Sequence, residues 1–458
     1  MARRQAAALS VAGGLLLLVT AAALAVTGDL TQPAGTAGCI SETGAGPCTD
    51  GHGLIEPREV AVSPDGKSVY VASWDLNLGD GDGAALVRLN RDTTTGAISQ
   101  PAGAAGCISE TGSGGCAEGH ALGRVWSVAV SPDGTSVYVA TGGGVARFNR
   151  NATTGAISQP AGAAGCISED GTGPCADGHA LAGAHSVTVS PDGKSVYVSS
   201  FTGPVNAVAR LNRSTTTGAI SQPAGAAGCV SETGAGPCAD GHGLGVPTGL
   251  AVSPDGKSVY VASRGNDAVA RFNRNTTTGA ISQPAGAAGC VSDEGAGPCA
   301  NGHGLEQPLS VAVSPNGKTV YAAAFVNDAV VRFERNTTTG AIFQPNDLPG
   351  CVSESGAGNC FNGHGLDGAA SVAVSPDGMT VYAAAFDSDA VARLNRNATT
   401  GAITQPAGTS GCVSETGAGT CADGHGLLPT PSSVAVSPDN KSVYVASGLA
   451  VVRFNRAP

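Results

Sequence analysis

Aromatic and charged side chains are both scarce in this 458-residue chain, at 4% and 13% of the residues. With so few aromatics, the core has to be packed mainly from Val, Ala and Ile. The net charge is −11 and no block of like charges occurs. Nucleic-acid binding is therefore not expected, because it needs a basic surface. After residue 28 no helical hydrophobic period appears, which excludes a solenoid of helices.

The first 27 residues differ in kind from the rest. Two arginines near the start precede an apolar run that continues to Val26. Ala23-Leu24-Ala25 is a small-x-small pattern typical of signal-peptide cleavage. Residues 1–27 are therefore predicted to be a secretory signal peptide cleaved near Ala25. The alternative is an uncleaved membrane anchor, since the run is almost long enough to span a bilayer. Both alternatives predict that residues 28–458 lie outside the cytoplasm.

One repeated segment fills almost everything after residue 28. Its clearest copy, Gly249 to Leu305, reads GLAVSPDGKSVYVASRGNDAVARFNRNTTTGAISQPAGAAGCVSDEGAGPCANGHGL. Self-similarity at a fixed period indicates a repeat architecture. The first Cys of each copy marks the period, and the last four are 61 residues apart: Cys39, Cys107, Cys166, Cys229, Cys290, Cys351 and Cys412.

Each repeat is predicted to form four short antiparallel strands, which is the blade of a β-propeller. Ser-Pro-Asp-Gly after the first apolar run predicts a tight turn, because Pro fixes φ and Gly accepts a positive φ. The β-branched and aromatic runs that follow are typical of strands. Pro284 ends the fourth strand, since Pro cannot donate to a ladder. The predicted strands of this copy are Leu250–Val252, Val259–Ala262, Val269–Arg274 and Ala280–Gln283.

The number of copies predicts how the ring closes. The first three strands occur seven times, whereas the fourth follows only six of them. The missing copy is at the other end of the chain, where Leu30-Thr31-Gln32-Pro33 matches Ile281 to Pro284. The sequence therefore predicts an all-β fold, a single seven-bladed β-propeller over residues 28–458 with four-stranded antiparallel blades. The N-terminal strand closes the ring, which leaves few exposed edges.

The fourteen cysteines form seven C-x8-C pairs, with none left over. In an exported chain, even and regular cysteines indicate disulfides. Zinc is the alternative, because a His follows each second Cys, although a closed site needs four ligands and shorter Cys spacing. A redox role is disfavoured by the absence of C-x-x-C. The predicted disulfide pairs are Cys39 with Cys48, Cys107 with Cys116, Cys166 with Cys175, Cys229 with Cys238, Cys290 with Cys299, Cys351 with Cys360, and Cys412 with Cys421.

Residues that recur in every copy are predicted to build the scaffold. A Gly-His pair after the second Cys, a Tyr in the second strand and an Arg in the third strand each occur seven times, as in His303, Tyr260 and Arg271. A catalytic site needs one asymmetric constellation, and seven equal copies do not supply it. WD-type propellers carry a Gly-His at the equivalent point.

Positions where the copies disagree are the candidates for function. The segments that lead into the first strand and those that join the second to the third should surround the channel mouth on one face. They carry both Trp residues, the only His outside the Gly-His series, and several Phe and Arg residues. The alternative is that loop positions drift and the aromatics cap gaps between blades. We predict catalytic roles for His185, Arg58 and Arg264, and ligand binding by Trp74, Trp126, Phe201, Phe325, Phe386 and Glu59, with Arg124 nearby.

One insertion stands apart from the repeat. Asp75 to Gly83 replaces the usual four-residue turn and is rich in Asp, Asn and Gly. Such oxygen ligands suit calcium, although the spacing is not that of an EF-hand. Calcium is therefore the one cofactor candidate, with a solvated Gly-Asp loop as the alternative, and the candidate ligands are Asp75, Asn77, Asp80 and Asp82.

The segments SPDGKSVYVAS and RFNRNTTTGAISQ resemble the repeats of seven-bladed lactonase-like propellers. That group includes bacterial 6-phosphogluconolactonases and carboxymuconate-lactonising enzymes. The signature S-P-D-G-x-x-V-Y-V also looks like the YVTN repeats of exported and surface-layer propellers. The resemblance covers residues 28–458 but rests on blade-building residues, and no catalytic motif of the family can be placed here residue by residue. Fold alone does not fix function.

The first functional hypothesis is a secreted or cell-surface binding protein. Its partner would be a small molecule or an extracellular protein, with membrane contact only through an uncleaved N-terminal segment. The alternative is a lactonase-like hydrolase or cycloisomerase at the channel mouth. There His185 would act as general base, and an Arg would hold a carboxylate or an oxyanion.

Overall fold

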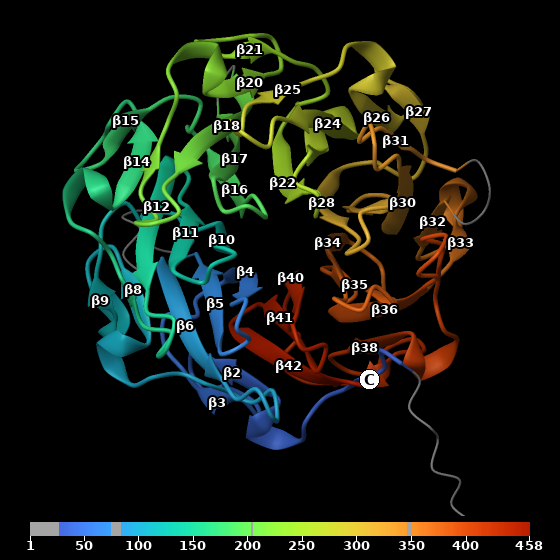
Figure 1. The fold of residues 1–458 in the computed structure, drawn as a ribbon. Coiled ribbons are helices and arrows are strands. Elements are labelled where there is room, and N and C mark those ends of the chain that lie inside the picture. The colour runs from blue at the N-terminus through green and yellow to red at the C-terminus, as the bar shows by residue number, and fades with distance from the viewer. Residues whose placement is uncertain (1–26, 75–83, 203–204, 346–349) are drawn as a thin grey trace, which may run out of the picture.

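The computed structural model describes residues 27–74, 84–202, 205–345 and 350–458, and these form seven sheets arranged in a ring around a central channel (Figure 1). The predicted seven-bladed β-propeller is confirmed. Each sheet is one blade, and we number the blades 1 to 7 in the order of their first strands. The first strands are β4 (Pro57–Val62), β10 (Ser127–Val130), β16 (Ala184–Val189), β22 (Pro247–Val252), β28 (Pro308–Val313), β34 (Ala369–Val374) and β40 (Pro431–Val436).

The second and third strands of each blade are longer and carry the core. The second strands are buried along almost their whole length, because Val, Tyr and Ala pack against the neighbouring blades on both faces. They are β5 (Ser68–Ser73), β11 (Ser136–Ala140), β17 (Ser195–Thr202), β23 (Ser258–Ser263), β29 (Thr319–Ala324), β35 (Thr380–Ala385) and β41 (Ser442–Ser447). The third strands are β6 (Ala85–Arg91), β12 (Gly144–Arg150), β18 (Val205–Arg213), β24 (Ala268–Arg274), β30 (Ala329–Arg335), β36 (Ala390–Arg396) and β42 (Ala450–Arg456).

The outer part of each blade differs from the prediction of one fourth antiparallel strand. The sheets have six strands and are mixed. In blade 4 the predicted fourth strand shrinks to β25 (Ile281–Ser282), which pairs only with the end of β24. After Pro284 a short turn, η7 (Gly286–Ala288), brings the first Cys back to the middle of β24. The strand that starts at this Cys is β26 (Cys290–Asp293), and β27 (Ala300–Gly302) pairs with it in parallel.

The same outer strands recur around the ring. Those that begin with the first Cys are β2 (Cys39–Ser41), β8 (Cys107–Ser109), β14 (Cys166–Glu169), β20 (Cys229–Ser231), β32 (Cys351–Ser353) and β38 (Cys412–Ser414). Their parallel partners are β3 (Thr49–Asp50), β9 (Ala117–Glu118), β15 (Ala176–Gly178), β21 (Ala239–Asp240), β33 (Phe361–Asn362) and β39 (Ala422–Asp423). The two-residue strands are β1 (Leu30–Thr31), β7 (Ile98–Ser99), β13 (Ile157–Ser158), β19 (Ile220–Ser221), β31 (Ile342–Phe343) and β37 (Ile403–Thr404).

Closure by the N-terminal segment is confirmed. β1 pairs with β42 through Leu30 opposite Arg456, and β2 pairs with β42 beside it. Blade 7 therefore combines strands from both ends of the chain. Within the described ranges the only helices are short 3₁₀ turns, and none is long and apolar enough to span a membrane.

All seven predicted disulfides are present, and each joins two cysteines nine positions apart. The first Cys of every pair is at most 2% exposed. No free cysteine is found in the part of the chain that the structure describes. Because every sulfur is bonded to another sulfur, the zinc alternative is wrong.

The Gly-His residues prove to be scaffold, as predicted. Gln100 holds the backbone of His52 from two sides, accepting from its N–H at 2.8 Å and donating to its carbonyl at 2.7 Å. The His52 ring nitrogen Nε2 lies 3.1 Å from the Gly103 carbonyl. Equivalent Gln contacts recur in every blade.

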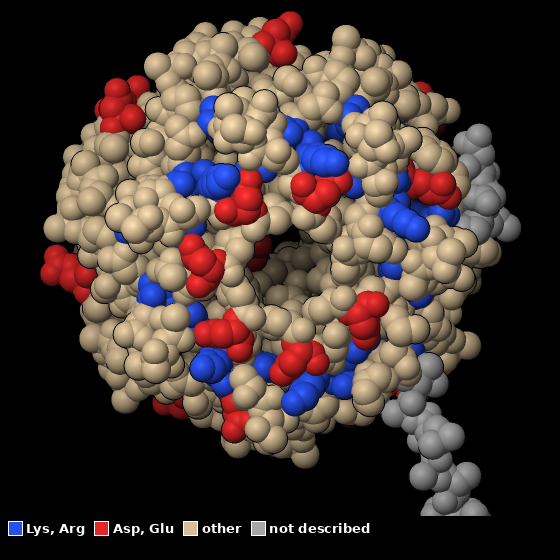
Figure 2. Space-filling model, in the orientation of Figure 1, with Lys and Arg blue, Asp and Glu red and all other residues tan. Residues whose placement is uncertain are grey.

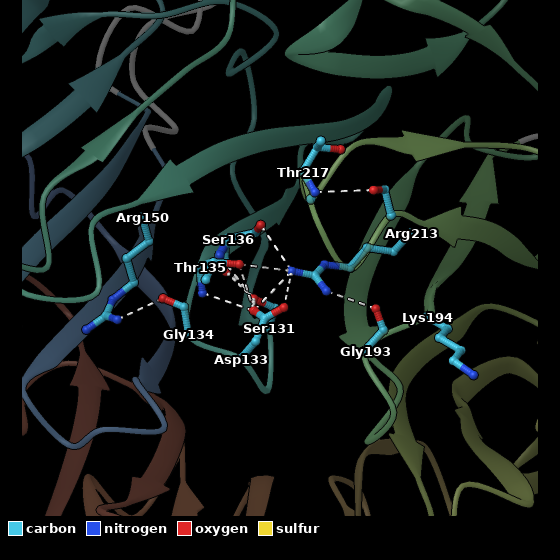
Figure 3. Close-up of polar contacts among 12 residues, drawn as sticks. Ser131, Asp133, Gly134, Thr135, Ser136, Arg150, Gly193, Lys194, Arg213 and Thr217 are labelled. Carbon is cyan, nitrogen blue, oxygen red and sulfur yellow. Dashed lines mark hydrogen bonds and ion pairs between the residues drawn. The ribbon is translucent and has the colours of Figure 1, made fainter.

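A clasp of Arg, Asp and Tyr joins each blade to the one before it. Arg213 of blade 3 donates to both carboxylate oxygens of Asp133, at 3.0 and 2.9 Å (Figure 3). It also donates to the Tyr138 hydroxyl at 2.7 Å. Tyr138 donates in turn to the Gly218 carbonyl at 2.6 Å. The Arg213 side chain is fully buried.

Opposite charges also lie side by side around the channel opening on the face seen in Figure 2. Some of the acidic side chains of the protein thus hold neighbouring blades together.

Candidate functional site

A β-bulge at the start of the first strand aims two successive side chains at the channel. In blade 1 the register shifts between Pro57 and Glu59, so that Arg58 is the extra residue. Bulges re-aim side chains in this way and are frequent near functional sites. Six of the seven first strands carry this bulge, and blade 2 is the exception. The extra residues are Arg58, His185, Thr248, Leu309, Ala370 and Ser432.

These residues and the loops between second and third strands surround a cavity of about 500 Å³. We call it the mouth cavity. Most of the predicted site residues line it, whereas Trp74 stands behind Trp126, and Arg124 is not part of the lining. The predicted residues in the lining are Arg58, Glu59, Trp126, His185, Phe201, Arg264, Phe325 and Phe386.

Four aromatic rings form a continuous arc along one side of the mouth cavity. Trp74 and Trp126 have ring centroids 4.4 Å apart, and Trp126 lies 4.9 Å from His185. Phe201 follows at 5.1 Å from His185. Such spacing is typical of favourable aromatic pairs. The rings are tilted against one another by 36°, 33° and 52°, so the arc presents a stepped aromatic surface, on which a ring can stack face to face with one member.

Arg58 lies against this arc. Its guanidinium carbon is 4.7 Å from the Trp74 ring centroid and 5.6 Å from that of Trp126. Glu56 accepts from it at 2.6 Å. Burial lowers the pKa of Arg58, and the Glu56 charge partly opposes this. The buried Nε of Arg58 finds no acceptor among the described residues.

Arg264 stands where other blades place an aromatic residue after the second strand. It begins the 3₁₀ turn η6 (Arg264–Asn266), and its side chain is exposed at the rim. Gln307 accepts from its Nε at 2.9 Å. This contact orients the guanidinium, which lines the mouth cavity on the far side of Phe201.

His185 is held as a neutral imidazole. Its Nδ1 lies 3.2 Å from the Thr248 carbonyl, so the tautomer that makes this hydrogen bond carries its proton on Nδ1. Burial lowers the pKa of His185 to about 4, and the positive charges of Arg58 and Arg264 act in the same direction. Nε2 therefore keeps its lone pair at neutral pH.

Glu59 interrupts a ring of serines on the channel wall. At the equivalent position five blades have Ser, and blade 4 has Gly249. Ser433, Ser127, Ser310 and Ser371 each accept a hydrogen bond from a backbone N–H of the next blade. The Glu59 carboxylate likewise accepts a hydrogen bond from the Val128 N–H at 3.1 Å. Part of the Glu59 side chain is exposed to the channel, but protein atoms pack closely around the carboxyl group. This burial raises the pKa of Glu59 to about 7.

The shifted pKa values of Glu59 and His185 predict opposite effects of pH on the free energy of unfolding. Folded protein holds the Glu59 proton up to pH about 7, whereas the unfolded chain releases it near 4.5, so this contribution is lost as pH rises through 7. Folded protein keeps His185 neutral down to about 4, while the unfolded chain takes up a proton near 6.5, so that contribution is lost as pH falls through 4. Each can reach about 3 kcal/mol at most.

In the native protein we expect the two effects on the unfolding free energy to offset each other between about pH 4.5 and 6.5. Glu59→Gln should leave an unfolding free energy that rises with pH from 4 to 6.5, and His185→Asn one that falls from 4.5 to 7. Guanidinium unfolding at a series of pH values measures both. Parallel curves for both variants and the native protein would contradict these assignments.

No metal centre accompanies the site in the described ranges, where no group of three or more His, Cys, Asp or Glu is placed to hold an ion. The predicted calcium ligands Asp75, Asn77, Asp80 and Asp82 lie outside the described residues. The sequence analysis did not predict the β-bulge or the hydrogen bonds that the serines accept from the next blade. The replacement of Ser by Glu59 and Gly249 in that column was the available signal for these hydrogen bonds.

Comparison with known proteins agrees with this fold. The sequence profile of the family described as "Lactonase, 7-bladed beta-propeller" matches residues 206–347, and that of "WD domain, G-beta repeat" matches residues 115–148. A search of curated protein sequences finds no match. The match to the lactonase profile falls on blades 3 to 5.

Solved structures extend the likeness to most of the chain. The periplasmic gluconolactonase of Pseudomonas aeruginosa is 16% identical, with a TM-score of 0.53 over 83% of this chain and 93% of that one. A Bacteroides uniformis protein provisionally assigned as a 6-phosphogluconolactonase is 16% identical, with a TM-score of 0.51 over 83% and 89%. Hydrazine synthase of Kuenenia stuttgartiensis is 16% identical, with a TM-score of 0.51 over 88% and 96%. In fold the chain is a lactonase-like seven-bladed β-propeller, as its blade signature predicts, and at these identities the likeness concerns the fold alone.

Proposed function

We propose that this protein is an exported propeller that binds a small ring-containing ligand in the mouth cavity. One observation carries the proposal: the residues that break the repeat gather in a single cavity. Both Trp residues and the one His outside the Gly-His series belong to its wall or stand directly behind it. The recurring His, Tyr and Arg residues are instead engaged between blades.

Export is supported by the cysteines. Seven disulfides form and persist in an oxidising compartment and are rare in the cytosol. The apolar run in residues 1–27 has the pattern of a secretory signal. The similar Pseudomonas aeruginosa gluconolactonase is named as periplasmic.

The lining favours a ligand that combines a ring with polar groups. Ligand sites are mostly apolar, with a few placed polar groups that fix orientation. Here the aromatic arc would stack on the ring. Arg58 and Arg264 would donate to a carboxylate or to hydroxyl oxygens, because a guanidinium presents several donors in a fixed fork.

Tryptophan fluorescence tests the binding. A ligand in the mouth cavity should change the emission of Trp74 and Trp126, the only two tryptophans of the protein. We expect Trp126→Ala to weaken binding of that ligand about tenfold or more, and Lys194→Ala, in a turn between a first and a second strand, to leave it unchanged. The affinity of Trp126→Ala is measured by calorimetry, because this variant lacks one of the two fluorophores. An affinity equal to that of the native protein would contradict this site.

A second candidate function is hydrolysis of a lactone in the same cavity. It is favoured by the combination of a neutral His185 and a Glu59 whose raised pKa lets it carry a proton. His185 would take a proton from the attacking water while an Arg stabilises the oxyanion. Protonated Glu59 would supply a proton to the ring oxygen as the C–O bond breaks.

Acid release from a panel of sugar and aliphatic lactones separates the two candidates. Hydrolysis predicts turnover that is lost in both His185→Ala and Glu59→Gln. Turnover that survives both substitutions would place the chemistry elsewhere. No turnover across the panel, together with a fluorescence response, favours the binding protein.

A further inference from the structure

Besides the arc, the mouth cavity contains a second aromatic surface. Phe325 of blade 5 and Phe386 of blade 6 have ring centroids 5.9 Å apart in an edge-to-face arrangement, and both line the cavity. The arc belongs to blades 1 to 3. Figure 1 shows that blades 5 and 6, with β28 and β34, lie across the channel from blades 1 to 3, with β4, β10 and β16. The cavity thus has two aromatic surfaces on opposite sides.

The polar groups of the cavity lie between and beneath these two surfaces. Arg264 of blade 4 stands between Phe201 of the arc and Phe325 of the second surface along the ring of blades. Serine hydroxyls line the channel wall below. Ser310 and Ser371 each accept one backbone N–H at 3.3 Å, which leaves their own protons for a ligand. Hydroxyl groups facing aromatic walls are suited to a ligand rich in hydroxyls.

The size of the cavity exceeds the needs of one sugar ring. About 500 Å³ lies well within the range of cavities that take drug-sized ligands. At blade 7 both mouth positions carry small residues, Ser432 and Gly448, and Gly448 and Leu449 separate β41 from β42.

We propose that the mouth cavity binds an acidic oligosaccharide of at least two rings, one on each aromatic surface, with its carboxylate on Arg264. This inference rests on the proposed ligand-binding function and specifies its ligand. Neither aromatic surface alone requires a second ring. Their opposition across one cavity, with a guanidinium between them, offers a stacking surface to each of two linked rings.

Calorimetry with sugar acids of increasing length tests the inference. The probes are galacturonic acid and mannuronic acid with their dimers and trimers, and the neutral galactose and mannose dimers. We expect at least one acidic dimer to bind about tenfold more tightly than its monomer, because a second stacked ring adds aromatic contact. Phe386→Ala should abolish this gain, so that the acidic dimer binds that variant no more tightly than the monomer does.

A second variant tests the charge. Arg264→Gln should reduce binding of the acidic dimer about tenfold and affect the neutral dimer much less, because the Gln amide still donates to hydroxyl oxygens but carries no charge for a carboxylate. Equal affinity for monomer and dimer, or a Phe386→Ala effect of the same size on both, would overturn the two-ring inference while the mouth cavity remained a binding site. Absence of binding for every acidic probe would overturn the ligand class. The proposed function itself fails if no ring-containing ligand changes tryptophan emission, or if Trp126→Ala leaves binding of such a ligand unchanged.

Discussion

Reduction of the seven disulfides is expected to unfold the propeller at guanidinium concentrations at which the oxidised protein stays folded. In the chain-entropy model each ten-residue loop contributes about 2–3 kcal/mol, so seven together contribute about 15–20 kcal/mol as an upper figure. Ordinary domains have a total stability of about 5–15 kcal/mol. The dependence should be strong here because aromatics make up only 4% of the residues. Unfolding followed by tryptophan emission, with and without reductant, measures the effect.

The ring closure offers a matched pair of variants for this prediction. Cys39–Cys48 lies in blade 7, where β2 joins β42 from the opposite end of the chain, whereas Cys229–Cys238 lies in the continuous blade 3. Both loops have the same length, so loop entropy alone predicts equal losses. We expect the Cys39→Ala/Cys48→Ala variant to lose more, because the N-terminal segment can then detach and open the ring. Unchanged transitions after reduction of all seven disulfides to fourteen thiols would contradict the whole argument.

Local rules were sufficient to predict most of the fold from the sequence. The Ser-Pro-Asp-Gly turn, the β-branched second strand and the strict period predict the blade, and the displaced Leu30-Thr31 copy predicts the closure that β1 and β42 make. The fourth strand was predicted incompletely. Ile281 and Ser282 look like a strand, but Pro284 stops it, and the next segment returns to pair with β24 through β26 instead. The disulfide holds β26 beside β27, and this pairing of the outer strands is tertiary structure that local propensity does not contain.

The candidate site was predictable as a set of positions and not as a geometry. Departures from the repeat point to Arg58, His185 and Arg264, and the structure brings all three to one cavity. The sequence contains no sign of the bulge that turns Arg58 and Glu59 toward the same channel. The pKa values of Glu59 and His185 depend on burial between neighbouring blades. Such properties arise only when segments about sixty residues apart meet.

The clasps supply the other large expected effect. Each clasp arginine is buried, and six of the seven bind an Asp of the preceding blade, whereas Arg396 meets Asn316 at 3.4 Å. The six ionic pairs are Arg91 with Asp439, Arg150 with Asp65, Arg213 with Asp133, Arg274 with Asp192, Arg335 with Asp255, and Arg456 with Asp377. We expect Arg213→Met to cost about 3–5 kcal/mol of unfolding free energy, because the Tyr138 and Gly193 contacts are lost together with the pair.

The exception at Asn316 allows the charge to be tested separately from the packing. Asp133→Asn should destabilise the protein and Asn316→Asp should stabilise it, each by about 1–2 kcal/mol. The values stay below those of fully buried ionic pairs, because 34% of the Asp133 side chain is exposed. Burial raises the pKa of Asp133, but hydrogen bonds from Ser131, Thr135 and Arg213 outweigh it and hold the pKa at about 2, so the contribution of Asp133 is complete above pH 3.8 and is lost as pH falls through 2.

Guanidinium unfolding of the two variants and of the double variant at pH 7 measures these changes. The double variant should return close to the native stability, because the two positions lie in different clasps and their effects add. If Asn316→Asp lowers stability, the hydrogen bond from Asn316 to the Ala398 carbonyl outweighs the missing charge, and the clasp acts through packing and neutral hydrogen bonds. If both single variants match the native protein, the six carboxylates serve the charge balance around the channel opening and not the cohesion of the ring.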